Sequence, residues 1–337
     1  MRSAEVALLA LLAAAATASG ERLAPGDREI SVDCGGRHRI ALIHVPPAAA
    51  GDAPLPVLFA FHGGGGNAEG HRAWTGLDAT ADGAGFLVVY PEGSGRFFER
   101  KLLTWNAGAC CGYAALEEID DVGASLALLA ELARRTPVDA TRIYASGLSN
   151  GSMMTFRLAH DAGDRIAGIA TVAGVARPEP FAPKRPMPII HFHSVDDPRA
   201  LYSGGLGPLL PFLTRVLHPP VEDTLRAWAR FDGCADSPRV AERRIGRAGA
   251  PDAAHTATLL VYDACASGAE VWLWKLTGAG HVWPGAAPRY PERLLGAPTQ
   301  VIDANELLWR FLSRFRRADA PALPMPLSSA PLDARGR

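Results

Sequence analysis

A serine in a tight glycine turn is the first candidate for chemistry in this sequence. The segment Gly147-Leu148-Ser149-Asn150-Gly151 follows an apolar run at 142–145 and precedes a stretch with helical apolar spacing at 151–160. A serine between a strand and a helix, with glycine on both sides, is typical of a nucleophile elbow, whose strained turn exposes the hydroxyl at the edge of a sheet. The sequence therefore predicts that Ser149 is a nucleophile.

A serine hydroxyl is a weak nucleophile at neutral pH, so a histidine base and an acid that orients it must accompany Ser149. His281 lies in a glycine-rich loop after the apolar run 271–276, and that loop is free to reach the serine. Asp197 follows the apolar run 188–192, at a strand end where sheet active sites assemble. The order Ser149, Asp197, His281 therefore predicts a catalytic triad, with Asp196 as the alternative acid.

A second glycine-rich segment, from His62 to Gly66, directly follows the apolar run 55–61. Its backbone N–H groups are suited to an oxyanion hole, which stabilises the negative oxygen of a tetrahedral intermediate. We expect one donor from Asn150 and the other from a residue near Gly64, with His62 orienting the loop rather than titrating. A merely flexible glycine turn is the alternative.

A metal site is a competing interpretation of the residues before the acid. His191, His193, Asp196 and Asp197 lie close together in the sequence, and two histidines on one face of a strand can share a cation. This metal-dependent hydrolase hypothesis leaves the serine turn unexplained. No Cys-x-x-Cys segment suggests structural zinc, and we expect no metal and no cofactor.

The elements that must position these residues alternate between strand and helix. Apolar runs at 40–43, 55–61, 86–90, 142–145, 166–172, 187–193, 256–262 and 271–276 predict strands, and helical spacing appears at 122–132, 151–160, 221–231 and 305–314. Asp120 and Asp121 suit the N-terminus of the first of these helices, although a functional carboxylate pair is an alternative. The alternation predicts the α/β class, with a mostly parallel central sheet flanked by helices as in the α/β-hydrolase fold.

The ends of the chain differ in composition from its centre. Arg2, the apolar run 6–16 and the small residues 16–18 predict a signal peptide at 1–18, and the apolar run is short for a membrane anchor, which is the alternative. Residues 319–337 are rich in Ala, Pro, Ser and Arg without periodicity, which predicts a disordered tail. We therefore expect one catalytic domain at 19–318, a secreted or periplasmic protein, and no membrane span in the mature chain.

Overall composition excludes some classes of protein. The 337 residues are 48% hydrophobic and 20% charged, which suits one large globular domain, and the formal net charge of −1 argues against nucleic-acid binding. Five cysteines would meet an oxidising compartment after export. We expect Cys234 to pair with Cys265, while Cys110 and Cys111 compete for Cys34, a choice that the sequence leaves open.

Several segments together resemble the polyhydroxybutyrate depolymerase and feruloyl esterase family: 105–112, 120–123, 147–154 and 280–285. The resemblance covers roughly residues 30–317 and implies ester hydrolysis, with Ser149, Asp197 and His281 as the triad. It also implies the family's helix and disulfide at 221–234 and Cys265. The chain departs from the pattern at 194–196, where Gly-Thr-Ala is expected, at Gly64 and the next glycine, where a cysteine is frequent, and at the additional Cys34.

The leading hypothesis is therefore a serine esterase that hydrolyses carboxylic esters through an acyl-serine intermediate. A non-catalytic secreted binding protein on the same fold is an alternative of a different class. We expect Trp105, Trp283 and the stretch 206–217 to wall a substrate pocket. No polymer-binding module follows the catalytic region, which favours short oligoesters or plant-derived aryl and acetyl esters over long polymers.

Overall fold

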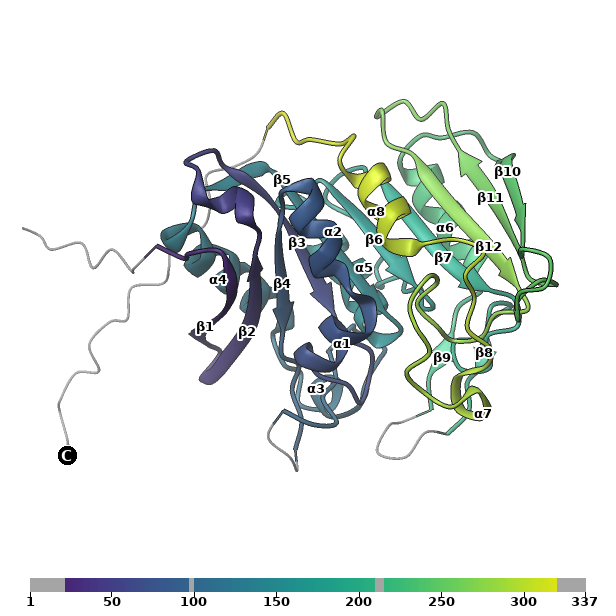
Figure 1. Ribbon diagram of the computed structural model, residues 1–337, viewed down its shortest axis with the longest axis horizontal. Helices are drawn as coiled ribbons and strands as arrows, with labels where there is room; N and C mark the ends of the chain where they lie inside the picture. Colours follow the sequence, from purple (N-terminus) through teal and green to yellow (C-terminus); the bar gives the residue numbers. More distant parts are fainter. Residues whose placement is uncertain (1–21, 97–99, 210–214, 320–337) are drawn as a thin grey trace, which may run out of the picture.

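The computed structural model describes residues 22–96, 100–209 and 215–319, which form a large sheet covered by helices on both faces (Figure 1). The sheet has ten strands in the order β1-β2-β4-β3-β5-β6-β7-β12-β11-β10. Their bounds are β1 (Gly26–Cys34), β2 (Arg37–Val45), β3 (Leu55–Phe61), β4 (Leu87–Pro91), β5 (Val138–Leu148), β6 (Gly168–Val172), β7 (Ile189–Ser194), β10 (Arg239–Ile245), β11 (Thr256–Tyr262) and β12 (Val271–Thr277). The short strands β8 (Gly205–Leu206) and β9 (Leu217–His218) pair separately.

The centre of the sheet is parallel, and its two edges are antiparallel. Strands β4, β3, β5, β6, β7 and β12 pair in parallel, whereas β1, β2, β10 and β11 join by antiparallel pairing. Every residue of β3, β6 and β7 is buried, as expected for parallel strands with helices on both faces.

The helices divide between the two faces of the sheet. They are α1 (Ala68–Thr75), α2 (Leu77–Ala84), α3 (Gly112–Leu116), α4 (Asp121–Arg135), α5 (Asn150–Asp161), α6 (Val221–Phe231), α7 (Glu292–Leu295) and α8 (Ala304–Leu312), with a 3-10 turn η1 (Pro47–Ala50). One apolar core contains Leu128, Phe156 and Trp228 from α4, α5 and α6, and the other contains Leu77 and Phe311 from α2 and α8. In Figure 1, α2 and α8 accordingly lie in front of the sheet, and α5 and α6 lie behind it.

The carboxyl ends of the parallel strands meet at one edge of the sheet, the lower edge in Figure 1. The glycine segment after β3, Ser149 after β5, Asp197 after β7 and His281 after β12 therefore start from the same edge. Helices α1, α3 and α7 and the β8–β9 pair gather there as well (Figure 1). The topology alone thus brings together residues that are far apart in the sequence.

The predicted strands and helices are all present, with shifts of a few residues at their ends. Asp120 caps α4 by accepting the N–H of Gly123 at 2.7 Å, while Asp121 is buried and lies 2.6 Å from the guanidinium of Arg39. These two carboxylates therefore stabilise the fold, one as a helix cap and one in a buried ion pair, and do not form a catalytic pair.

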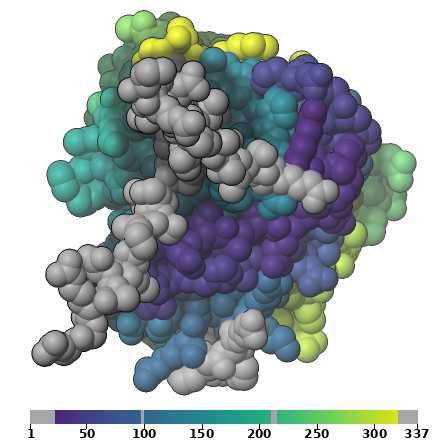
Figure 2. All heavy atoms as spheres, turned by 90° about the vertical axis from the view of Figure 1, so that its left-hand side faces the viewer, coloured from purple at the N-terminus to yellow at the C-terminus, as the bar shows by residue number. Residues whose placement is uncertain are grey.

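In the described ranges, eight strands and helices have no counterpart among the predicted ones: β1, β8, β9, β10, α1, α2, α3 and α7. Strands β1 and β10 lie at the edges of the sheet and carry many exposed polar residues, so neither shows an apolar run. The hairpin of β1 and β2 forms much of the surface in Figure 2, where it is purple. Helices α1 and α2 have eight residues each and contain glycine, which weakens the helical pattern. The predicted signal peptide and nearly all of the predicted tail lie outside the described residues.

The cysteines correct one expectation. Cys234, after α6, forms a disulfide with Cys265, after β11. Cys110 and Cys111 do not compete for Cys34: these two adjacent residues bond to each other, and Cys34 is free. Cys34 is the last residue of the edge strand β1, whereas Cys110 and Cys111 directly precede α3.

Candidate active site

Ser149 occupies the turn between β5 and α5. Its backbone has φ 58° and ψ −120°, a conformation that residues other than glycine rarely adopt, so the turn is strained. A Cβ on Gly147 would lie 2.4 Å from the backbone of Gly151, and a Cβ on Gly151 would lie 2.2 Å from the carbonyl oxygen of Phe61. Both positions therefore require glycine, which explains the residues around the serine.

His281 and Asp197 are buried and in direct contact: Nδ1 of the histidine lies 2.8 Å from Oδ2 of the aspartate. Backbone hydrogen bonds fix the histidine loop, from Gly280 N to Ala297 O at 2.9 Å and from His281 N to Leu295 O at 2.5 Å. Because a carboxylate only accepts, Nδ1 carries the proton and Nε2 remains an acceptor. This is the tautomer that a general base needs.

Asp197 is held as an anion by several donors. Its Oδ1 accepts the backbone N–H groups of Arg199 at 2.7 Å and Ala200 at 2.9 Å. Burial raises the pKa of Asp197, but the charge and hydrogen bond of His281 and the backbone donors outweigh it, so the pKa lies below its ordinary value. The carboxyl is therefore ionised over the neutral pH range.

Asp196 does not join His191 and His193 in a metal site. Its Oδ2 accepts the N–H of Gly278 at 2.7 Å, and it is more exposed than Asp197. His191 and His193 are buried, and their rings are hydrogen-bonded to each other. Asp197, rather than Asp196, meets His281.

The two histidines belong to a buried row of hydrogen bonds behind the acid. The row runs from Thr171 Oγ1 to His191 Nδ1 (2.8 Å), from His191 Nε2 to His193 Nδ1 (3.0 Å), and from His193 Nε2 to the carbonyl of Ala200 (2.8 Å). Since that carbonyl only accepts, His193 Nε2 carries a proton, and it also lies 3.5 Å from Oδ2 of Asp197. Burial lowers the pKa of both histidines, so the row is neutral and directs a donor toward the acid. Sequence reasoning missed this arrangement, although the His-x-His pattern before the acid was its signal.

The glycine segment after β3 lies beside the serine, and its histidine is fixed. His62 Nδ1 donates to the carbonyl of Gly63 at 2.9 Å and Nε2 accepts the N–H of Gly93 at 3.1 Å. Burial lowers its pKa to about 4, so His62 orients the loop in neutral form. Within the described residues, the N–H groups of Gly64 and Asn150 have no hydrogen-bond partner, and both residues line the same cavity as Ser149.

The side chain of Asn150 has a role that the sequence did not reveal. Its Oδ1 accepts the N–H of Trp105 at 2.8 Å, and its Nδ2 donates to the carbonyl of Trp105 at 3.1 Å. This double hydrogen bond ties the loop that carries Cys110 and Cys111 to the serine turn.

The prediction that Trp105 and Trp283 wall the substrate pocket is wrong. Their side chains are 0% and 1% exposed, and neither lines a cavity beside Ser149. Trp105 Nε1 donates to the carbonyl of His62 at 2.8 Å, and Trp283 Nε1 donates to Oδ1 of Asn305 at 2.9 Å. Each indole thus fills the core and satisfies its N–H internally.

Two cavities open beside Ser149 and His281. The first, here called the glycine-loop cavity, has a volume of about 580 Å³; besides the glycine segment, its lining includes His71, Trp74, Lys101, Arg289 and Tyr290. The second, here called the cysteine-side cavity, has a volume of about 430 Å³ and is lined by Cys110, Cys111, Met153, Pro208, Leu209 and Val216 among others. The predicted pocket stretch 206–217 therefore contributes to the second cavity, although 210–214 lie outside the described residues.

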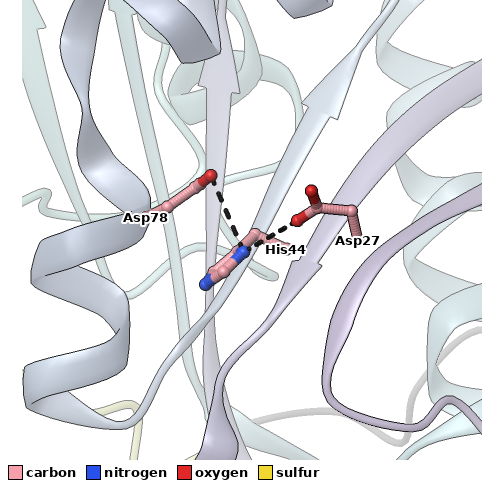
Figure 3. Close-up of side chains that lie close together, drawn as sticks. All are labelled: Asp27, His44 and Asp78. Carbon is pink, nitrogen blue, oxygen red and sulfur yellow. Dashed lines mark hydrogen bonds and ion pairs between the residues drawn. The ribbon is translucent and has the colours of Figure 1, made fainter.

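One cluster of metal-ligating side chains lies away from these cavities. Among the described residues, only Asp27, His44 and Asp78 bring three such ligand atoms close together (Figure 3). The guanidinium of Arg72 lies 2.5 Å from each of the two carboxylates, and Asp82 lies 2.8 Å from His44 Nε2. Because the Arg72 guanidinium pairs with both carboxylates, we assign the cluster a structural role that joins the β1–β2 hairpin to α1 and α2.

Comparison with known proteins agrees with this geometry. Residues 40–207 match the esterase PHB depolymerase family. The chain is 30% identical over 302 residues to NocK of Nocardia uniformis subsp. tsuyamanensis, an esterase by name, which covers 85% of this chain and 81% of that protein. It is 26% identical over 251 residues to feruloyl esterase B of Piromyces equi, which covers 72% of this chain but 42% of that protein.

Solved structures support the fold. Native sOPH superposes with a TM-score of 0.52 at 16% identity, over 93% of this chain and 94% of that one. Native pOPH gives 0.51 at 14% identity, over 91% and 92%. The predicted α/β-hydrolase fold is thereby confirmed, and in the described ranges no helix is long and apolar enough to cross a bilayer. The protein is a carboxylic ester hydrolase, and the chain belongs to the PHB depolymerase family of esterases.

Proposed function

We propose that this esterase works through a covalent acyl-serine intermediate, with Ser149, His281 and Asp197 as its triad. The observation that carries the proposal is the buried contact between His281 Nδ1 and Asp197 Oδ2, 2.8 Å long, in a loop that lines the same cavities as Ser149. The contact leaves Nε2 as an acceptor for the serine proton. His281 first takes this proton and then gives it to the departing alcohol, and a water repeats the sequence to release the acid.

The oxyanion hole in this proposal uses the N–H groups of Gly64 and Asn150. Both are without internal partners in the described structure, and Asn150 is the first residue of α5, where the helix dipole favours negative charge. The tetrahedral oxygen would thus receive two hydrogen bonds that the ground-state carbonyl receives less well. No cofactor is needed for this reaction.

The substrate in this proposal is a short oligoester or a plant-derived aryl or acetyl ester. The cysteine-side cavity is mainly apolar and suits a small acyl group, while the larger cavity accommodates the rest of the molecule. The named activities of the related proteins, feruloyl esterase and acetylxylan esterase, are compatible with this range. Export to the periplasm or medium is part of the proposal and rests on residues 1–18.

Hydrolysis by the purified mature protein tests the proposal. The substrates are methyl ferulate, an acetylated xylo-oligosaccharide and a 3-hydroxybutyrate oligomer, with p-nitrophenyl acetate as a generic ester. We expect a burst of p-nitrophenol equal to the enzyme concentration and turnover of at least one of the three esters. The Ser149→Ala variant should lose both, whereas Ser152→Ala, one helical turn away and buried, serves as the matched control. Unchanged activity in Ser149→Ala would refute the acyl-serine mechanism.

A further inference from the structure

The glycine-loop cavity has a positive lining. Lys101 and Arg289 line it, and no aspartate or glutamate is among its described lining residues. Neither cation has a hydrogen bond or ion pair with any residue in the described ranges, whereas most of the arginines in those ranges are paired. Two unpaired cations in a cavity that also contains the nucleophile attract an anionic group of the substrate.

The segments that carry these cations are fixed to the catalytic loops. On one side, Gly65 N donates to the carbonyl of Leu103 at 2.8 Å, and Asn67 Nδ2 donates to the carbonyl of Arg100 at 2.8 Å. These bonds hold the backbone on both sides of Lys101 against the glycine segment. Lys101 is therefore presented to the cavity by an ordered backbone.

On the other side, Tyr290, next to Arg289, packs edge-on against Trp74 with ring centroids 5.1 Å apart. Farther along the same segment, the carbonyl of Leu295 accepts the N–H of His281 at 2.5 Å. The aromatic pair and the backbone bond place Arg289 on a segment tied both to α1 and to the catalytic histidine.

A buried histidine also lines this cavity. His71 is 3% exposed and lines the cavity, yet its Nε2 has no hydrogen-bond partner in the described structure. An unpaired buried nitrogen is unfavourable, and a polar group of a bound molecule would satisfy it. This atom is independent of the two cations and also indicates a polar ligand.

We infer that the substrates of this esterase carry a carboxylate, which binds in the glycine-loop cavity to Lys101 and Arg289 while His71 contacts a polar group nearby. The inference deepens the proposed function and rests on it. A carboxylate of this kind occurs at the free end of a hydroxyacid oligoester and on a uronic acid of an acetylated plant oligosaccharide. The reaction itself is unchanged, because the carboxylate is held away from the ester bond that breaks.

Two matched substrate pairs test the inference. One pair is the 3-hydroxybutyrate trimer and its neutral terminal amide; the other is an acetylated xylo-oligosaccharide with and without a uronic acid. We expect wild-type kcat/KM to be higher for the acid of at least one pair, and the pair that responds identifies the source. Lys101→Ala and Arg289→Ala should each reduce this preference about fivefold, mainly through KM, and added salt should weaken it. Arg293→Ala removes an exposed charge of α7 outside the cavity and should leave the preference unchanged.

The outcomes separate the two proposals. An acid preference that survives in the Lys101→Ala, Arg289→Ala double variant overturns the inference, and so does equal or absent hydrolysis in both pairs while p-nitrophenyl acetate is turned over. If the wild-type protein hydrolyses neither substrate pair nor p-nitrophenyl acetate, the proposed function itself fails. Activity of the double variant on p-nitrophenyl acetate shows that it is folded.

Discussion

Replacement of Asp197 with asparagine tests how His281 is oriented. The Oδ1 position of Asp197 accepts the backbone N–H groups of Arg199 and Ala200, so the amide of an asparagine must place its oxygen there. Its NH₂ group then faces His281 Nδ1 from the position of Oδ2, 2.8 Å away. Because NH₂ only donates, Nδ1 must become an acceptor, and the proton moves to Nε2, where it blocks acceptance of the proton from Ser149.

The expected loss is large although the shape of the side chain is preserved. An inverted histidine tautomer reduces kcat about 10⁴-fold, which corresponds to about 5 kcal/mol of transition-state stabilisation. The assay is the steady-state and burst hydrolysis of p-nitrophenyl acetate at neutral pH, with the melting temperature measured for each variant. Asp196→Asn is the matched control and should stay within about threefold of wild type, because that carboxylate contacts the backbone of Gly278 instead.

Either of two results would refute this reasoning. A folded Asp197→Asn variant that keeps more than a tenth of the wild-type kcat would mean that the carboxylate does not set the tautomer. A large loss in Asp196→Asn with a small one in Asp197→Asn would mean that the acid has been assigned to the wrong residue.

Three further predictions concern the supports of the site. Gly151→Ala should lower the free energy of unfolding by more than about 3 kcal/mol in urea titration, because its Cβ would lie 2.2 Å from a backbone oxygen, and a stable variant would contradict this. Asn150→Ala should lower kcat about tenfold on p-nitrophenyl acetate with little change in KM, because the backbone N–H and carbonyl of Trp105 lose their hydrogen bonds to the Asn150 amide. Asn150→Asp keeps the acceptor for the N–H of Trp105 and should retain more activity. Burial opposes protonation of His44, but its bonds to Asp82 and Asp27 outweigh this and raise its pKa, with Arg72 and Asp78 also facing it. The unfolding free energy of wild type should therefore exceed that of His44→Gln by up to about 1 kcal/mol below about pH 6.5, and the difference should decline as the pH rises through the folded pKa; a difference that grows with pH would contradict this.

The central part of the fold is predictable because burial on both faces leaves a clear record in sequence. Strands such as β3 and β7 consist of apolar runs bounded by proline or glycine. The turn at Ser149 needs glycine on both sides because a Cβ there would clash with neighbouring backbone atoms. The glycine segment after β3 follows from the same physical requirements, and the order of serine, acid and histidine stays a prediction, to which the structure adds the contact between Asp197 and His281. Residue types and their spacing are therefore enough to predict these features.

The missed features depend on contacts that no local pattern records. Large aromatic residues suit ligands, which is why Trp105 and Trp283 are expected in a pocket, but the same rings also fill cores, and only packing distinguishes the two. The pairing of Cys110 with Cys111 is absent from the expected disulfides, since neighbouring cysteines rarely bond to each other. The clamp made by the Asn150 side chain joins residues 45 positions apart, a distance that sequence spacing does not reveal.

The choice between Asp196 and Asp197 illustrates what makes a buried acid suitable for this chemistry. A carboxylate out of water stays ionised only if donors surround it, and Asp197 receives two backbone N–H groups, His281, and the more distant N–H of His193. The charge state of His193 matters as well, because a protonated His193 would pair with Asp197 and compete with His281 for its charge. Burial lowers the pKa of His193 and so removes this competition. The histidines that suggest a metal site in the sequence are thus neutral, and His193 directs a donor to the acid; in the proposed mechanism this leaves the charge of Asp197 available to the imidazolium that forms when His281 takes the serine proton.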